Sequence, residues 1–155
     1  MEIREPRPDE HDRIATELLR PGYREAEERE PEYCNLTEQA RTVPSLDSWL
    51  GEDDRTILVA VTDDEELVGD VSGAVSPTPP IYDRPPVVYC DGLYVRPEYR
   101  REGVETALLD RLVDWGRERG CGFFSLSVHV DNERATEFFE EYGMEQAYRS
   151  MRTSI

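Results

Sequence analysis

The sequence contains no lysine, so all 18 of its basic residues are arginines. They are outnumbered by 35 aspartates and glutamates, which give a formal net charge of -17. Nucleic acid is not expected as a partner, because backbone binding needs a basic face and these arginines are scattered among acids. Salt screens the repulsion among so many negative charges, since the Debye length falls to about 3 Å at 1 M salt. We therefore expect a halophilic protein; an ordinary acidic protein is the alternative.

Cysteines and long apolar runs are also scarce. Cys34, Cys90 and Cys121 are odd in number and widely spaced, which argues against a disulfide framework and a Cys-x-x-Cys metal site. His11 and His129 have no partners at metal-ligand spacing, so no metal is expected. No segment approaches the roughly 18 apolar residues of a membrane span, and the N-terminus lacks an apolar signal region. These absences predict reduced thiols and a soluble, cytoplasmic protein without a membrane partner.

The length of 155 residues fits one domain, residues 1–155. Apolar residues at helical spacing predict a helix from Asp9 to Leu19. Residues 23–32 are nearly all charged and predict an exposed helix or loop, whereas residues 37–50 are ambiguous.

The middle of the chain has the pattern of strands. Two apolar runs at 56–61 and 67–75 flank a short acidic turn, which predicts a β-hairpin. The Pro-rich stretch 76–86 cannot lie inside a sheet and predicts a loop. A third strand is expected at Val87–Val95, with alternate residues on one face. Those residues are Val87, Tyr89, Asp91, Leu93 and Val95.

Helical spacing returns at Val104 and ends at a basic last turn and Gly120. A further strand is predicted at Phe123–Val130, followed by a helix that Asn132 caps and Gly143 ends. The remaining residues are compatible with a final strand or two. Strand, helix and strand form a β-α-β unit, so the pattern indicates a mixed α/β domain.

The stretch from Arg100 to Thr106 is the turn between a predicted strand and a predicted helix. Such a turn presents unpaired N–H groups at the positive end of the helix dipole, where anions bind. Arg100 and Arg101 can add charged donors, and Gly103 lets a phosphate approach the backbone. Many strand-to-helix turns carry a glycine and an arginine without a ligand, so the turn alone is a weak signal.

Two motifs in order resemble the GNAT superfamily of N-acetyltransferases. "LYVRPEYRREGVETALL" is similar to its acyl-CoA motif, Q/R-x-x-G-x-G/A after a strand ending L-x-V, and Leu93, Val95, Arg100 and Gly103 match it. "SLSVHVDNERATEFFEEYGM" looks like the next strand and helix of the family, and "TILVAVTDDEELVGDVSGAV" like its hairpin. The resemblance covers about residues 56 to 145. It implies a mixed, mostly antiparallel sheet with a β-α-β acyl-CoA-binding core and helices on both faces.

The resemblance also implies acetyl-CoA as co-substrate and an amine as acceptor. The pyrophosphate of the cofactor would lie on amides between Arg101 and Thr106, and its pantetheine arm along Leu93–Val95. Domains of this kind often dimerise, so a homodimer is compatible with the resemblance. The expected cofactor contacts are Leu93, Tyr94, Val95, Arg100, Arg101, Glu102, Gly103, Val104, Glu105, Thr106, Asn132 and Phe139.

Two residues depart from the family pattern, since Glu105 replaces a glycine or alanine and Phe139 replaces a frequent tyrosine acid. A carboxylate about 4 Å from a phosphate costs about 1 kcal/mol in water and about 4 kcal/mol at a dielectric near 20. Glu105 is expected either to turn outward to an arginine or to satisfy the helix N-terminus itself.

The chemistry of acetyl transfer needs a neutral amine, a polarised thioester carbonyl and a proton for the leaving thiolate. The resemblance implies that backbone N–H groups of Leu93–Val95 polarise the carbonyl. Asp91, expected on the face of Leu93, is our candidate general base; an Asp that starts a bend is the alternative. Tyr89, Tyr94 or water would protonate the thiolate, whereas Tyr142 has the spacing of a core aromatic.

The sequence therefore predicts an N-acetyltransferase acting on a primary amine of a small molecule or a protein. The alternative is an inactive acyl-CoA sensor or a protein-interaction module on the same fold, which Glu105 and Phe139 would favour. An unrelated α/β domain is the third hypothesis. The resemblance implies that the acceptor is chosen by the N-terminal helices and the loop after residue 76, where the resemblance is weakest.

Overall fold

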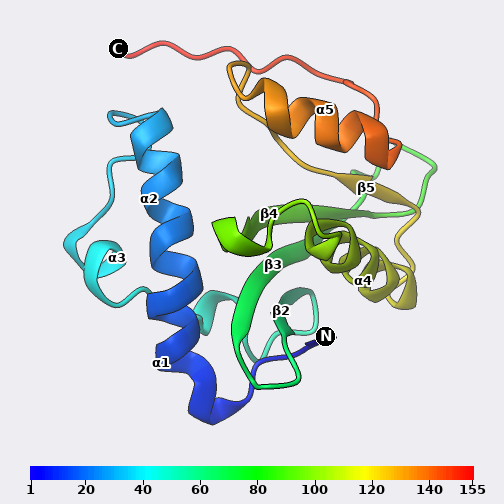
Figure 1. Ribbon diagram of the computed structural model, residues 1–155. Coiled ribbons are helices and arrows are strands. Elements are labelled where there is room, and N and C mark those ends of the chain that lie inside the picture. Colours follow the sequence, from blue (N-terminus) through cyan, green and yellow to red (C-terminus); the bar gives the residue numbers. More distant parts are fainter.

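The chain folds around a mixed five-stranded β-sheet in the computed structural model, which describes residues 1–155 (Figure 1). The strand order is β1-β2-β3-β4-β5, in which the first four strands are antiparallel neighbours and β5 runs parallel to β4. The predicted hairpin and the predicted β-α-β unit are both confirmed. The strands are β1 (Glu2–Arg4), β2 (Arg55–Val61), β3 (Leu67–Ser76), β4 (Val87–Val95) and β5 (Phe123–Ser125).

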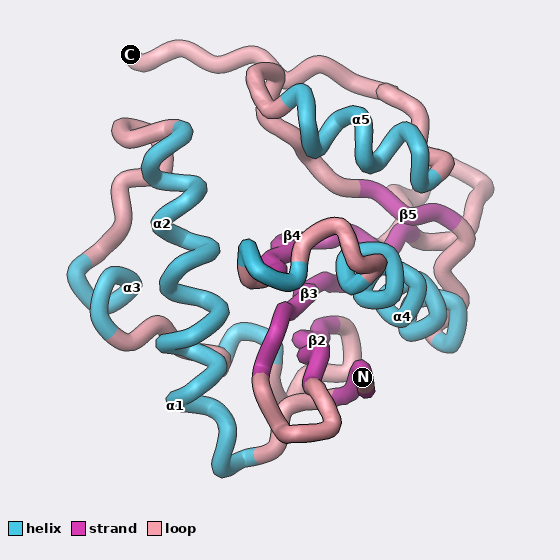
Figure 2. Tube along the Cα trace, viewed as in Figure 1, coloured by secondary structure: helices cyan, strands magenta, loops and turns pink.

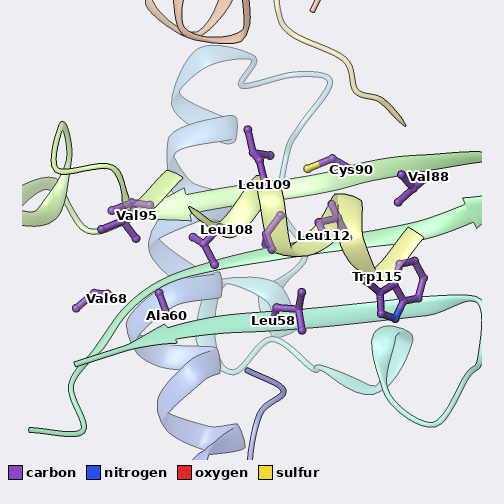
Figure 3. Close-up of a cluster of buried hydrophobic side chains, with 12 residues drawn as sticks. Leu58, Ala60, Val68, Val88, Cys90, Val95, Leu108, Leu109, Leu112 and Trp115 are labelled. Carbon is purple, nitrogen blue, oxygen red and sulfur yellow. The ribbon is translucent and has the colours of Figure 1, made fainter. Parts of the chain in front are cut away.

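One face of the sheet is covered by α4, which spans Val104–Glu118 (Figure 3). Its apolar side chains recur at helical spacing and pack onto β2, β3 and β4. Gly73 on β3 allows this close approach, because a Cβ there would lie 2.8 Å from Leu112 Cδ1. The buried cluster consists of Leu58, Ala60, Val68, Val71, Val88, Cys90, Val95, Val104, Leu108, Leu109, Leu112 and Trp115.

The opposite face is covered by the N-terminal helices, so helices lie on both faces as predicted (Figure 1). The helix expected to end at Leu19 instead continues without a break to Arg29. A π turn precedes Pro21, and the N–H of Arg20 donates to the carbonyl of Ala15, five residues back. Pro21 has no N–H and crowds the preceding turn, and the wider turn accommodates it. The segments are η1 (Pro8–Glu10), α1 (His11–Ile14), η2 (Ala15–Leu19) and α2 (Arg20–Arg29).

The remaining helices are short or lie late in the chain. The ambiguous residues 37–50 form α3 (Glu38–Thr42) and η3 (Asp47–Trp49), and η4 (Pro97–Tyr99) follows β4. The final helix α5 (Glu133–Tyr142) is capped by Asn132 and ended by Gly143, as predicted. No helix combines the length and apolar character that crossing a membrane requires.

The strand predicted at Phe123–Val130 is too long, because β5 ends at Ser125. Residues 126–130 diverge from β4 and have no partner strand, so they form no ladder. Residues 144–155, whose sequence is compatible with a final strand, are irregular and run out from the end of α5 (Figure 2).

Candidate active site

The turn before α4 exposes a continuous run of backbone donors. Arg101 and Gly103 have positive φ angles of 66° and 86°, which bend the chain so that Gly103 begins the helix. The first helical bond is the N–H of Ala107 to the carbonyl of Gly103. None of the N–H groups from Arg101 to Thr106 donates to a protein acceptor. The turn therefore has the donors and the dipole orientation that favour an anion.

Arg100 does not extend towards this turn. Its Nε donates to the carbonyl of Val95 at 2.7 Å, and its terminal nitrogen bonds to Glu25 of α2 at 2.7 Å. The guanidinium also lies over the ring of Tyr94, 5.5 Å from the centroid. Arg100 thus fastens the turn to β4 and α2, whereas Arg101 is exposed and makes no ion pair.

Glu105 is half-buried in the first turn of α4 and makes neither of the contacts expected for it. It forms no ion pair with an arginine, and its carboxylate accepts no hydrogen bond from the helix N-terminus. The amides of the turn are therefore not occupied by this side chain.

β4 and β5 separate beside the turn. Their pairing covers Val87 to Tyr89 and stops at the pair Tyr89–Ser125. From Cys90 onward, the edge of β4 that faces β5 has no strand partner. The hydroxyl of Tyr89 bonds to Oγ of Ser127 at 3.0 Å and spans the point of divergence. This opening is where an extended ligand could pair with β4.

A β-bulge at Asp91 corrects the predicted face of β4. Cys90 pairs with Gly73 and Gly92 with Ser72, so Asp91 is the extra residue. Leu93 packs with the α4 cluster, whereas exposed Asp91 accepts a hydrogen bond from Trp49 Nε1 at 3.3 Å. The prediction that Asp91 shares a face with Leu93 is therefore wrong, because the bulge reverses the alternation between them.

Three aromatic or capping residues near the opening have defined partners. Asn132 Oδ1 accepts the N–H of Ala135 at 3.2 Å and so caps α5. Phe139 stacks edge-to-face on Phe138, with the ring centroids 5.3 Å apart. The hydroxyl of Tyr142 donates to Asp110 at 2.8 Å, and burial together with this bond raises its pKa. A tyrosine held in this way is a poor proton donor.

A family model described as "Acetyltransferase (GNAT) family" matches residues 14–144. The chain belongs to the GNAT acetyltransferase family. An aminoglycoside N(6')-acetyltransferase type 1 from Acinetobacter baumannii is 30% identical over 64 residues, which are 41% of this chain and 44% of that protein. A thialysine N-epsilon-acetyltransferase from Sus scrofa is 29% identical over 56 residues, 36% of this chain and 33% of that protein. The chain thus spans half or less of the length of these relatives.

Solved structures share the GNAT fold. A mutant of the BH1408 protein from Bacillus halodurans superposes with a TM-score of 0.86 at 20% identity, over 100% of this chain and 99% of that one. The aminoglycoside acetyltransferase AAC(6')-Iy, in complex with a bisubstrate analog, superposes with a TM-score of 0.72 at 19% identity, over 99% of this chain and 97% of that one. The predicted GNAT-like architecture is confirmed.

Asp70 is a buried carboxylate of β3, opposite the strand of the candidate site, that the sequence analysis missed. It lies on β3, paired with Tyr94 of β4, and only 3% of its surface is exposed. Burial raises the pKa of its carboxyl to about 7, and its Oδ1 has no hydrogen-bond partner. The signal was available in the run "LVGDVSG", where an acid interrupts a strand that is apolar on both sides.

Proposed function

We propose that this GNAT-family protein is an N-acetyltransferase that moves the acetyl group of acetyl-CoA to a primary amine of a small molecule or a protein. The observation that carries the proposal is the unbroken run of free amides from Arg101 to Thr106, at the N-terminus of α4 and beside the open edge of β4. The names of the relatives support amine acetylation, and two of them differ in acceptor.

Backbone groups and a few side chains would hold acetyl-CoA. The pyrophosphate would accept hydrogen bonds from the amides of Arg101 to Thr106, with the free guanidinium of Arg101 at the rim. Gly103 suits this role, because its positive φ favours glycine and no side chain screens the amides there. The pantetheine arm would pair with Leu93–Val95 along the unpaired edge of β4. Arg100 acts as a brace for the turn. The further contacts proposed are Tyr94, Glu102, Val104, Glu105, Asn132 and Phe139.

Acetyl transfer then needs three functions from this chain. Asp91 would accept the proton of the incoming ammonium, directly or through a water, so that the free amine attacks the carbonyl carbon. Backbone N–H groups of Leu93–Val95 would stabilise the charge on the carbonyl oxygen. As the carbon–sulfur bond breaks, Tyr89 would supply the proton to the thiolate, with Tyr94 or water as alternatives. Trp49 holds the Asp91 carboxylate in place.

The acceptor is proposed to be cationic, because an acidic surface attracts amines in their protonated form. A surface hollow of about 380 Å³ lies where the chain enters and leaves η3, close in sequence to Trp49. Three acids and one arginine line it. Its lining residues are Asp47, Ser48, Glu52, Asp54 and Arg55. An aminoglycoside is a suitable first acceptor to test.

The cellular setting is part of the proposal. All three cysteines are free thiols, which fits a reducing cytoplasm. The net charge of -17, in a sequence without lysine, fits a cytoplasm rich in salt. We also propose that residues 1–155 act as one domain.

A catalytically inactive acyl-CoA-binding module is the second candidate function. The free carboxylate of Glu105 lies in the first turn of α4, close to the proposed phosphate site, and Phe139 has no hydroxyl to donate. Such a protein would bind acetyl-CoA, or another protein, without turnover.

Calorimetric titration with acetyl-CoA and with CoA tests the cofactor site. In molar salt we expect the parent to bind with a micromolar Kd, and Glu105→Gly to bind about 5-fold more tightly because a repulsion of about 1 kcal/mol is removed. Gly103→Asp is the matched control and should bind acetyl-CoA more weakly than the parent, because it adds a carboxylate to the same turn. Absence of binding by the parent and by Glu105→Gly would refute the proposal. Binding by Glu105→Gly alone would favour the interaction module.

A further inference from the structure

A pair of hydroxyl groups lies at the point where β4 and β5 separate. The hydroxyl of Tyr89 donates a hydrogen bond to Oγ of Ser127 at 3.0 Å. Tyr89 is the last residue of β4 that pairs with β5, and Ser127 follows β5 in the segment that diverges from β4. The bond therefore joins the two sides of the opening at its closed end.

The hydroxyl pair lies on the face of the sheet that is opposite to α4. Val88 and Cys90, on either side of Tyr89, are buried in the α4 cluster (Figure 3), so the side chain between them points away from that helix. Asp91 extends to the same side, since its hydrogen-bond donor Trp49 packs with the cluster beneath the N-terminal helices. The proposed proton acceptor and the hydroxyl pair thus share one side of β4.

The other candidate proton donors are engaged elsewhere. Phe139 has no hydroxyl, and Tyr142 donates to Asp110, so that burial and this bond raise the pKa of its phenol. Tyr94 packs with the cluster beneath the N-terminal helices, and burial raises the pKa of its hydroxyl. Tyr89 differs from both, because its hydroxyl is bonded to another hydroxyl and not to a carboxylate.

The partner of Tyr89 can reverse the direction of the bond. A serine hydroxyl both accepts and donates hydrogen bonds, whereas a carboxylate only accepts them. Ser127 accepts from the neutral phenol, and it can turn its own hydrogen towards the oxygen once the phenol has lost its proton. Ser127 is also exposed, since Leu126 before it packs towards α4 and leaves it on the other side of the segment. Bulk water can therefore restore the proton.

We propose that Ser127 is a positioning residue for Tyr89 in acetyl transfer, an inference that rests on the proposed function and selects Tyr89 over Tyr94 as the proton donor. As the carbon–sulfur bond breaks, the proton of Tyr89 passes to the thiolate sulfur, and the proton of Ser127 passes to the phenolate oxygen. A proton from water then replaces that of Ser127. The ammonium nitrogen of the acceptor loses two protons in the reaction and the sulfur gains one, so one net proton goes to solvent.

Single-turnover release of thiol from acetyl-CoA in molar salt tests the inference, with a panel of primary amines that includes an aminoglycoside. Ser127→Ala should slow this step about 10-fold, a part of the roughly 100- to 10,000-fold that a positioned proton donor contributes. Ser127→Thr keeps a hydroxyl and should restore most of the parental rate. Ser125→Ala is the matched control, since it removes a hydroxyl two residues earlier in the chain and should keep the parental rate.

Further measurements separate a proton path from a purely structural role. In mixtures of H2O and D2O the parental rate should fall along a curve, because more than one proton moves, whereas that of Ser127→Ala should fall along a straight line. In the Tyr89→Phe background, Ser127→Ala should cause no further loss of rate. Calorimetry should give Ser127→Ala the parental affinity for acetyl-CoA. In the protein without cofactor, a double-mutant cycle on the unfolding free energy should show that the two hydroxyls are coupled.

The outcomes distinguish this inference from the proposed function. A parental rate for Ser127→Ala would overturn the inference alone. So would a loss that Ser127→Thr does not restore, an equal loss from Ser127→Ala in the Tyr89→Phe background, or an unfolding cycle without coupling. A parent that releases no thiol with any of the amines would overturn the proposed function, and this inference with it.

Discussion

Replacing Asp91 by asparagine should lower kcat by about 100- to 10,000-fold, the range that general-base catalysis contributes. Asparagine keeps an oxygen that can accept the hydrogen bond from Trp49, so the bulge should fold unchanged while the proton acceptor is lost. The measurement is the release of free thiol from acetyl-CoA in molar salt, with an aminoglycoside that the parent acetylates.

Asp64→Asn is the control for this variant, since Asp64 is an exposed aspartate in the turn between β2 and β3 and should leave kcat unchanged. Calorimetry on Asp91→Asn should give the acetyl-CoA affinity of the parent. An Asp91→Asn enzyme with parental kcat would assign the base role elsewhere and leave Asp91 as the bulge residue alone.

The difference in unfolding free energy between Asp70→Asn and the parent should grow by up to about 4 kcal/mol in favour of the variant between pH 4 and pH 8. An unfolded aspartate ionises near pH 3.8, whereas burial raises the pKa of folded Asp70 to about 7. Between these values the unfolded parent binds fewer protons, so its stability falls as the pH rises. Above the folded pKa the carboxyl is ionised in both states and the loss stops.

Denaturant unfolding at constant salt, over that pH range, measures this difference. The cost of burying an amide at the same place is independent of pH, so it displaces the whole curve without changing its slope. Asp64→Asn again serves as the exposed control and should run parallel to the parent. Parallel curves for the parent and Asp70→Asn would mean that the Asp70 carboxyl is hydrated or paired in solution.

Periodic segments of this fold were predictable from the sequence because one local pattern decides them. The α4 helix, its glycine end and the Asn132 cap of α5 depend on neighbours three or four residues apart. The free amides of the candidate site followed from the same reasoning, since any helix start leaves its first N–H groups unpaired. These features need no long-range information.

The errors arose where distant segments decide the local structure. The bulge at Asp91 depends on how β4 aligns with β3, and nothing within β4 shows it. The end of β5 at Ser125 depends on the missing neighbour strand, although residues 123–130 have strand composition throughout. Arg100 was expected to face a phosphate, yet a carbonyl of β4 and a glutamate of α2 bind it instead.

Arg100 makes the bracing of the turn before α4 depend on the N-terminal helix. Its bond to Glu25 joins positions separated by 75 residues, so the turn gains this brace only after the N-terminal helix has docked on the sheet. An excised β4-α4-β5 unit would retain Gly103, the helix start and the bond from Arg100 to Val95, but it would lose the bond from Arg100 to Glu25. Grafting that unit onto another scaffold would therefore transfer the motif without its rigidity, and the host would need an acidic partner of its own to restore it.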